Sequence, residues 1–164
     1  MEKKQFIFAG FGLLSLIIIS FSPVVFKSSP KKRDWKGVIK QQDGSSCGVA
    51  CLQMIFQHYK IFSDVEDIKE HILQEKDGSS FLSLKKYTEG KGLVAKGWQC
   101  NYQVLQEIVN PSILWIEETH FAVLDSLNRD SIYIRDPLKG RLIMNKSDFL
   151  DKWSGAVLTF DKKP

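Results

Sequence analysis

The stretch QQDGSSCGVACLQMIFQHY, residues 41–59, decides the fold of this chain and holds the first of its three cysteines. The large apolar residues in it recur at the i, i+3, i+4, i+7 spacing of one helix face: Leu52, Ile55, Phe56 and Tyr59. This spacing predicts a helix over about 47–60 whose apolar face packs inward. The first cysteine lies at the N-terminal end of that helix and follows a run of small polar residues, and this placement needs an explanation.

Cys47 lies in the first turn of the predicted helix, after Ser45 and Ser46, whose hydroxyls can cap the free N–H groups there. The same N–H groups and the helix dipole favour negative charge, which lowers the pKa of a thiol. Gly48 lets a substrate or backbone approach closely. We therefore treat Cys47 as a candidate nucleophile, with a buried core cysteine as the alternative.

A thiolate nucleophile needs a histidine as acid and base, and a third group that orients the imidazole. His58 lies eleven residues beyond Cys47 in the same predicted helix, too far along its axis to reach the thiol. His71 lies in a charged, solvated helix. His120 opens the apolar run HFAVLD, and the next run, SIYIRD, ends in Asp136. His120 and Asp136 are therefore the candidate partners of Cys47.

The two runs 120–125 and 131–136 predict a β-hairpin. If its loop is 127–129, His120 and Asp136 lie directly opposite each other on one face, with Cβ atoms about 5 Å apart. A shift of one residue would turn Asp136 to the other face. Asp125 and Asp130 are rival orienting groups, and Asp136 could serve only as a turn residue, because Asp-Pro favours turns.

The remaining pattern predicts helices first and strands afterwards. Further helices are expected at 64–76 and 80–92, then a short strand near 94–100 and a helical turn at 101–110. After Pro111, short apolar or alternating runs follow one another: SILWIE, HFAVLD, SIYIRD, GRLIM and AVLTF. Such runs predict an antiparallel sheet, so the fold class is a segregated α+β domain.

Composition limits the function classes. The 164 residues are 43% hydrophobic and include 11 Phe, enough for one domain with a true core. The net charge of +4 is mild and no basic stripe is interleaved with aromatics, so we expect no nucleic-acid partner. Three cysteines without a CxxC pair predict neither a disulfide framework nor a metal site, and no cofactor is expected. Cys51 and Cys100 are expected to be structural.

The N-terminus contains 21 consecutive uncharged residues, from Phe6 to Phe26. About twenty such residues cross a bilayer as a helix. An uncleaved single-pass anchor is favoured over a cleaved signal peptide, because Pro23 follows the best small-residue site. The predicted organisation is an anchor or signal segment at 1–26, a basic linker at 27–34 and a folded domain at 35–164.

The predicted location is a cell membrane, crossed by this single span. Lys and Arg are more numerous after the span than before it, which leans towards a cytoplasmic domain. Cleavage of the segment would instead give a secreted or periplasmic protein. The side of the membrane therefore stays open.

Three motifs together resemble the C39 peptidases, a family of papain-like bacterial cysteine proteases. They are Gln41-x5-Cys47 followed by GVACLQMI, His120 followed by FAVL, and IRD136PLKG. The segment LSLKKYTEGKGLVAKGW resembles a further signature of the family, and the likeness extends over about 36–160. Well-known members remove leaders after a Gly-Gly pair from bacteriocin and related peptides.

The resemblance implies a papain-like fold and a role for each motif residue. Cys47 would be the nucleophile, His120 the general base and acid, and Asp136 the group that orients the imidazole. Gln41 would supply an oxyanion-hole amide, with its neighbour Gln42 as the alternative one position away.

Two departures from the family pattern bear on the substrate. Transporter-linked members usually carry an acidic residue where this chain has Ser46, and no ATPase domain follows here. We therefore expect a stand-alone, membrane-anchored cysteine endopeptidase that acts on a peptide or protein precursor, with an export system as a further partner. The alternatives are a non-catalytic leader-binding module and a papain-like amidase or acyltransferase.

Overall fold

The computed structural model describes residues 32–73 and 78–163. The predicted anchor at 1–26 and residues 27–31 of the predicted linker lie outside these residues. Within the described ranges, no helix is both long and apolar enough to cross a bilayer. The described residues comprise nearly all of the domain predicted at 35–164.

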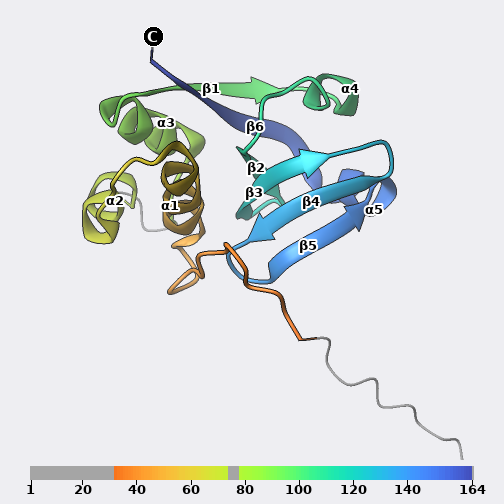
Figure 1. The fold of residues 1–164 in the computed structure, drawn as a ribbon, viewed down its shortest axis with the longest axis horizontal. Coiled ribbons are helices and arrows are strands. Elements are labelled where there is room, and N and C mark those ends of the chain that lie inside the picture. The colour runs from red at the N-terminus through yellow and green to blue at the C-terminus, as the bar shows by residue number, and fades with distance from the viewer. Residues whose placement is uncertain (1–31, 74–77, 164) are drawn as a thin grey trace, which may run out of the picture. The chain divides into compact units, whose positions relative to one another are not determined.

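Five helices lie in the described residues, and the three longest precede the first strand (Figure 1). They are α1 (Cys47–Tyr59), α2 (Val65–Ile72), α3 (Phe81–Gly90), α4 (Tyr102–Leu105) and α5 (Lys146–Leu150). The Asp64 carboxylate accepts the N–H of Glu66 at the start of α2, and Ser80 and Ser83 form a capping box at the start of α3. These caps fix where the two predicted helices begin.

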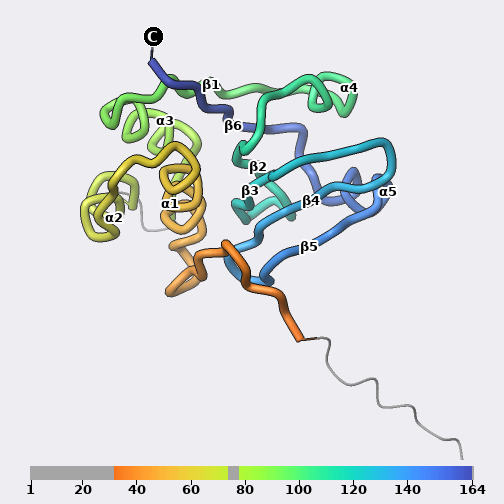
Figure 2. The backbone as a smooth tube through the Cα atoms, in the orientation of Figure 1, coloured from red at the N-terminus to blue at the C-terminus, as the bar shows by residue number. Residues whose placement is uncertain are grey.

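Six strands form one antiparallel sheet in the described part of the chain, in the order β1-β6-β2-β3-β4-β5. They are β1 (Leu93–Gln99), β2 (Ser112–Ile116), β3 (His120–Leu127), β4 (Ser131–Asp136), β5 (Gly140–Asn145) and β6 (Trp153–Lys162). The runs predicted after Pro111 are all strands, and the α+β class is confirmed. Figure 2 shows how the last strand, β6, returns to lie beside β1.

Both faces of the central strands are buried, and each face has its own core. One core joins the helices to the sheet, with α1 against β3 and α3 against β1. It includes Leu52, Ile55, Phe56, Leu84, Phe121, Val123 and Phe160. The other core lies under α4 and α5 and includes Leu105, Ala122, Leu124, Ile134, Phe149 and Trp153. Alternate residues of β3 serve the two cores, which explains why its first five residues are all buried.

The register of the β3–β4 hairpin differs from the prediction. Its pairs are Val123 with Arg135, Leu124 with Ile134, Ser126 with Tyr133 and Leu127 with Ile132. The pairing shifts between Leu124 and Ser126, so Asp125 is an extra residue, a β-bulge, in β3. The innermost pair, Leu127 with Ile132, encloses the four residues 128–131, where the prediction had a three-residue loop at 127–129, so the directly opposed pairing of His120 with Asp136 is wrong.

The bulge nevertheless leaves His120 and Asp136 on one face. Continued from Arg135, the register places Asp136 opposite Ala122, two residues from His120 and thus diagonal to it. Without the bulge, the pairing near the loop would continue and set Asp136 opposite Val123, on the other face. The four-residue connection and the extra residue in β3 would each alone turn Asp136 to the other face, and together they keep it on the face of His120.

The helix–sheet core predicts a large cost for truncating α1. Leu52 has no exposed surface, whereas Leu82 of α3 is 58% exposed. We expect Leu52→Ala to lower the free energy of unfolding by about 2–5 kcal/mol, because it leaves a cavity. Leu82→Ala, the same change at an exposed helical site, should cost less than about 0.5 kcal/mol. Urea unfolding of both variants measures this, and equal costs would contradict the helix–sheet core.

Candidate active site

The predicted site residues stand at the ends of three elements. Cys47 is the first residue of α1, His120 the first of β3 and Asp136 the last of β4. His120 Nε2 lies 3.0 Å from Asp136 Oδ1, and both residues are buried. Cys47 is also buried, and the imidazole is close enough to affect the titration of its thiol. The structure thus brings all three residues together, by a hairpin register different from the predicted one.

Asp136 is held as an acceptor in a fully buried position. Its Oδ1 accepts the backbone N–H groups of Leu138 at 2.7 Å and Lys139 at 3.0 Å, in addition to His120. Burial would raise the pKa of this carboxyl, but the hydrogen bond and charge of His120 and the two N–H groups lower it below the usual value. The Asp-Pro sequence therefore forms the expected turn and also fixes a carboxylate against the imidazole.

The imidazole of His120 is biased towards its charged form. Burial lowers the pKa of His120, but hydrogen bonding and charge from Asp136 and Cys47 outweigh it and raise the pKa to about 9. Because Nε2 contacts Asp136, the other ring nitrogen, Nδ1, is left for the thiol. At neutral pH the ring can hold a proton and deliver it.

The pKa of the Cys47 thiol is shifted in the opposite direction to that of His120. Burial raises its pKa, but the His120 imidazole and the backbone amides of Phe121 and Gly48 more than offset this, so the pKa is lowered. Burial raises the pKa of Cys51, one turn further along α1, well above the usual value. The arrangement therefore favours a thiolate–imidazolium pair at Cys47 alone.

The serine hydroxyls before α1 do not cap it, which corrects the expectation for Ser45 and Ser46. Ser46 is the N-cap residue, but its hydroxyl accepts the N–H groups of Gln42 and Asp43, at 2.9 and 3.0 Å. Ser45 donates instead to the Asp43 carboxylate. The preceding loop competes for these hydroxyls, so neither serine side chain occupies the first-turn N–H groups of α1.

The two adjacent glutamines are used differently. Both line one hollow together with His120, and the Gln41 Nε2 donates to the Asp43 carbonyl at 2.8 Å. Gln42 turns to α2, where its Oε1 accepts from Lys69 at 2.7 Å. An amide NH₂ has two hydrogens, so Gln41 keeps one donor after its contact with Asp43.

A hollow of about 450 Å³ opens beside His120. Its lining comes from the loop before α1, the β2–β3 turn and the β4–β5 turn: Gln41, Gln42, Asp43, Gly44, Glu117, Thr119, His120 and Leu138. The sequence did not indicate the β2–β3 turn as a wall, since it contains no Gly or Asn, yet Glu117 and Glu118 have φ of 51° and 59°. Ion pairs from Glu117 to Lys139 and Lys152 hold this turn in place.

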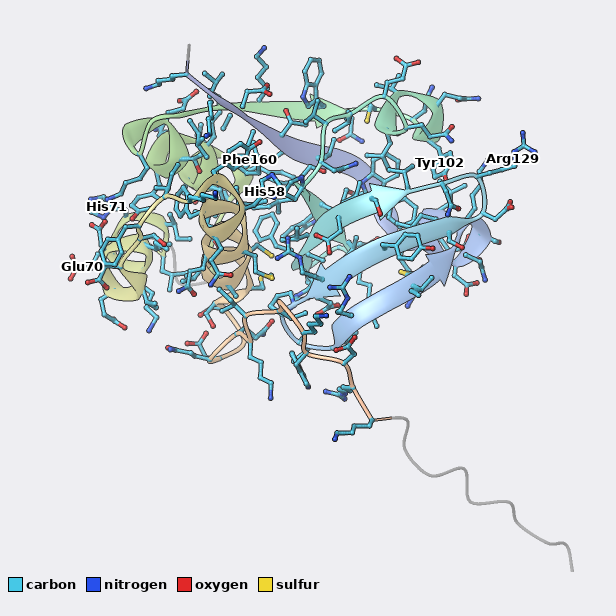
Figure 3. All side chains as sticks on the ribbon, in the orientation of Figure 1. His58, Glu70, His71, Tyr102, Arg129 and Phe160 are labelled. Atoms are coloured by element: carbon cyan, nitrogen blue, oxygen red, sulfur yellow. The ribbon has the colours of Figure 1, made fainter. Side chains whose placement is uncertain are left out.

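The other candidate residues lie elsewhere. His58 and His71 belong to the helical part, as Figure 3 shows, and both are exposed. Asp125 pairs with Arg135 at 2.7 Å, and Asp130 is exposed in the hairpin loop. Cys51 is fully buried, Cys100 is half-buried, and both are free thiols.

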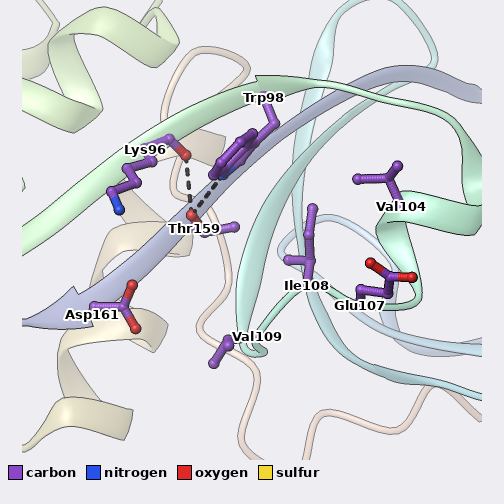
Figure 4. A pocket seen from close by; sticks show the side chains of 8 residues that line it. All are labelled: Lys96, Trp98, Val104, Glu107, Ile108, Val109, Thr159 and Asp161. Atoms are coloured by element: carbon purple, nitrogen blue, oxygen red, sulfur yellow. Dashed lines mark hydrogen bonds between the residues drawn. The ribbon is translucent and has the colours of Figure 1, made fainter.

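A second hollow, of about 260 Å³, lies between β1, β6 and the region of α4 (Figure 4). The residues that line it are Lys96, Trp98, Val104, Glu107, Ile108, Val109, Thr159 and Asp161. Trp98 is hydrogen-bonded through its indole N–H to Thr159. This lining contains neither a cysteine nor a histidine, whereas the first hollow is lined by His120.

Two relatives show the similarity in sequence. The chain is 33% identical over 129 residues to the lactococcin-G-processing and transport ATP-binding protein LagD of Lactococcus lactis subsp. lactis, covering 75% of this chain and 18% of that protein. It is 29% identical over 159 residues to the probable functional amyloid protease FapD of Pseudomonas fluorescens, covering 89% of this chain and 70% of that protein. The chain therefore spans under a fifth of the first relative.

Solved structures show the similarity in fold. A double glycine motif protease from an AMS/PCAT transporter, in complex with the leader peptide, matches with a TM-score of 0.74 at 30% identity, over 77% of this chain and 91% of that one. The peptidase domain of Streptococcus ComA matches with a TM-score of 0.70 at 18% identity, which shows a common fold. The fold is thus the papain-like one that the sequence resemblance implied.

The model of the peptidase C39 family matches residues 35–164, which include Cys47, His120 and Asp136. The match agrees with the motif resemblance and with the similarity of structure. The chain belongs to the peptidase C39 family.

Proposed function

We propose that this protein is a cysteine endopeptidase that cleaves a peptide or protein precursor, with Cys47, His120 and Asp136 as its catalytic residues. The observation that carries the proposal is the buried line from carboxylate to imidazole to thiol at the uncapped start of α1. Membership of the C39 family supports it.

The reaction follows from the charges of these groups. The Cys47 thiolate attacks the scissile carbonyl carbon, an S–C bond forms, and the carbonyl electrons move to oxygen. The C–N bond then breaks as His120 gives its proton to the leaving amine, which leaves an acyl-enzyme. His120 next takes a proton from water, the resulting hydroxide attacks the acyl carbon, and the S–C bond breaks to release the acid. Asp136 orients the ring and stabilises its charged form.

Oxyanion stabilisation is assigned to Gln41 and to the start of α1. The contact with Asp43 orients the Gln41 amide with its nitrogen towards the loop and leaves one hydrogen for the oxyanion. The backbone N–H of Cys47 is the second donor. Gln42 is the weaker candidate because its side chain is bound by Lys69.

We further propose that the substrate has small residues on the acyl side, as in a Gly-Gly leader. Gly48, next to the nucleophile, has no space for a side chain, because an added Cβ would collide with the Ser79 hydroxyl. Gly78, at φ 109°, lies against Ser45. These contacts pack the start of α1 closely against the segment at 78–79, and what supports a narrow substrate is the similar structure, which is that of a double glycine motif protease.

We also propose a location at the membrane and an export system as a partner. The uncharged run from Phe6 to Phe26 supports anchoring at the bacterial cell membrane. The similarity to LagD, named as a processing and transport protein, supports a precursor that is destined for export. The domain would then meet its substrate beside an export system.

A synthetic peptide with an internal Gly-Gly pair tests the function directly. We expect the full chain to cut it after the second glycine, with both products identified by mass spectrometry. Cys47→Ala should lower the rate by more than about a thousandfold, since it removes the nucleophile. Cys51→Ala is the matched control and should still cleave. Binding without cleavage would favour a leader-binding module, and amide exchange in place of hydrolysis would favour an acyltransferase.

The thiolate–imidazolium pair predicts a pH dependence. Alkylation of Cys47, followed by peptide mapping, should set in below the pH at which free thiols titrate, about 8.5. In His120→Ala the titration should move to higher pH, because burial then raises the thiol pKa without the opposing imidazole. His58→Ala, at an exposed position on the same helix as Cys47, should not change the profile. A profile that is the same in all three proteins would contradict the pair.

The two glutamines can be separated by kinetics. Gln41→Ala should lower kcat by about 10²–10³-fold with little change in KM, because the lost donor acts only in the transition state. Gln42→Ala removes an amide held by Lys69 and should change kcat far less. The reverse order of effects would move the oxyanion role by one position.

A further inference from the structure

Residues 33–41, here called the strap, lie along the β4–β5 turn, which directly follows the proposed orienting carboxylate of Asp136. Figure 2 shows this segment passing the β4–β5 turn before it enters α1. The Asp34 carbonyl accepts the N–H of Arg141 at 2.7 Å, and the N–H of Gln41 donates to the Pro137 carbonyl at 3.1 Å. Arg33 donates to the Leu138 carbonyl at 3.2 Å. The strap is therefore bound on both sides of the turn that follows Asp136.

The turn is shaped to receive the strap. Gly140, at φ 92°, lies so close to Asp34 that an added Cβ would be 2.5 Å from its carbonyl oxygen. Glycine is needed here for both the backbone conformation and the approach of the strap. The strap and the β4–β5 turn therefore pack in close contact, although they are about a hundred residues apart in the chain.

An arginine–aspartate–arginine cluster lies between the strap and the sheet. Arg135 and Arg141 are directly paired across β4 and β5, where like charges would repel. Asp125 lies between them, 2.7 Å from Arg135 Nε and 3.9 Å from Arg141 Nη2. Both arginines also donate to strap carbonyls, Arg135 to Gly37 at 3.0 Å and Arg141 to Lys36 at 3.3 Å.

The cluster includes the β-bulge, which determines how His120 and Asp136 are placed. Asp125 is the bulged residue of β3, and the bulge is what places Asp136 on the same face as His120. Arg135 immediately precedes Asp136 in β4, and its side chain is only 13% exposed. A planar guanidinium can bind the bulge carboxylate and the strap carbonyl at once in a fixed geometry, which an ammonium group cannot do.

We infer that Arg135 is a positioning residue, which ties the strap at Gly37 to the bulge at Asp125 and so fixes the end of β4 where Asp136 meets His120. This rests on the proposed function, in which Asp136 orients the catalytic imidazole. Arg135 does not touch the reacting atoms, and it acts through Asp136.

The test compares Arg135→Lys with Arg129→Lys in the full chain. Both changes keep the charge, and both lie in the same hairpin, but Arg129 projects from its tip into solvent (Figure 3). In Arg135→Lys we expect alkylation of Cys47 by iodoacetamide at pH 7 to slow by about threefold or more, with equal rates at pH 10. The reason is that a displaced Asp136 supports the imidazolium, and hence the thiolate, less well. In Arg129→Lys the rates should equal those of the unchanged protein.

Asp125→Asn keeps the shape of the bulge residue and removes its charge, and it should slow alkylation in the same direction. If Arg135→Lys melts below the assay temperature, the alkylation rate of Cys47 in Asp125→Asn tests the positioning role instead. In the cleavage assay Arg135→Lys should lower kcat and leave KM unchanged, whereas a merely stabilising residue would shift only the melting temperature.

The outcomes separate this inference from the proposed function. If the unchanged protein cleaves its peptide and both variants alkylate normally at pH 7, the positioning role is overturned and the endopeptidase stands. If the variants slow alkylation but no peptide is cleaved, the positioning role stands and the endopeptidase fails. If His120→Ala does not alter alkylation of the unchanged protein, both fail, because there is no pair to position.

Discussion

The contact between His120 and Asp136 is the interaction on which the rest of the site depends. A buried carboxylate without a partner would take up a proton, and a buried imidazole without a carboxylate would lose one. Together they keep opposite charges in a place where either alone would be neutral, and the imidazole in turn lowers the pKa of the Cys47 thiol. The contact exists because an extra residue in β3 corrects the parity of the hairpin.

The start of α1 supplies the second requirement, an unoccupied helix N-terminus. In α2 and α3 a side chain accepts a first-turn N–H group, whereas in α1 the Ser46 hydroxyl is bound to the preceding loop. The free N–H groups favour negative charge on the thiolate and, in the proposed reaction, on the oxyanion. A stabilising cap would compete with that chemistry, which gives a physical reason for its absence at this one helix.

The chain is organised so that distant segments meet at these two places. The strap leads from the N-terminal region to α1 and binds the turn after Asp136 on the way. The hollow beside His120 is formed by the loop before α1, at residues 41–44, together with the β2–β3 and β4–β5 turns. In the proposed function, the leaving amine would lie on this side, because His120 delivers its proton there.

The sequence by itself determined what depends on local spacing. Helical periodicity placed Cys47 in the first turn of α1, alternation after Pro111 gave the strands, and the motifs gave the family. Only the tertiary structure decided the bulge at Asp125, the use of the Ser46 hydroxyl, and which of Gln41 and Gln42 is bound by Lys69. The reason is that each of these depends on competition between partners far apart in the chain. Residue spacing sets a period, but the packing of strands and loops against each other sets a register.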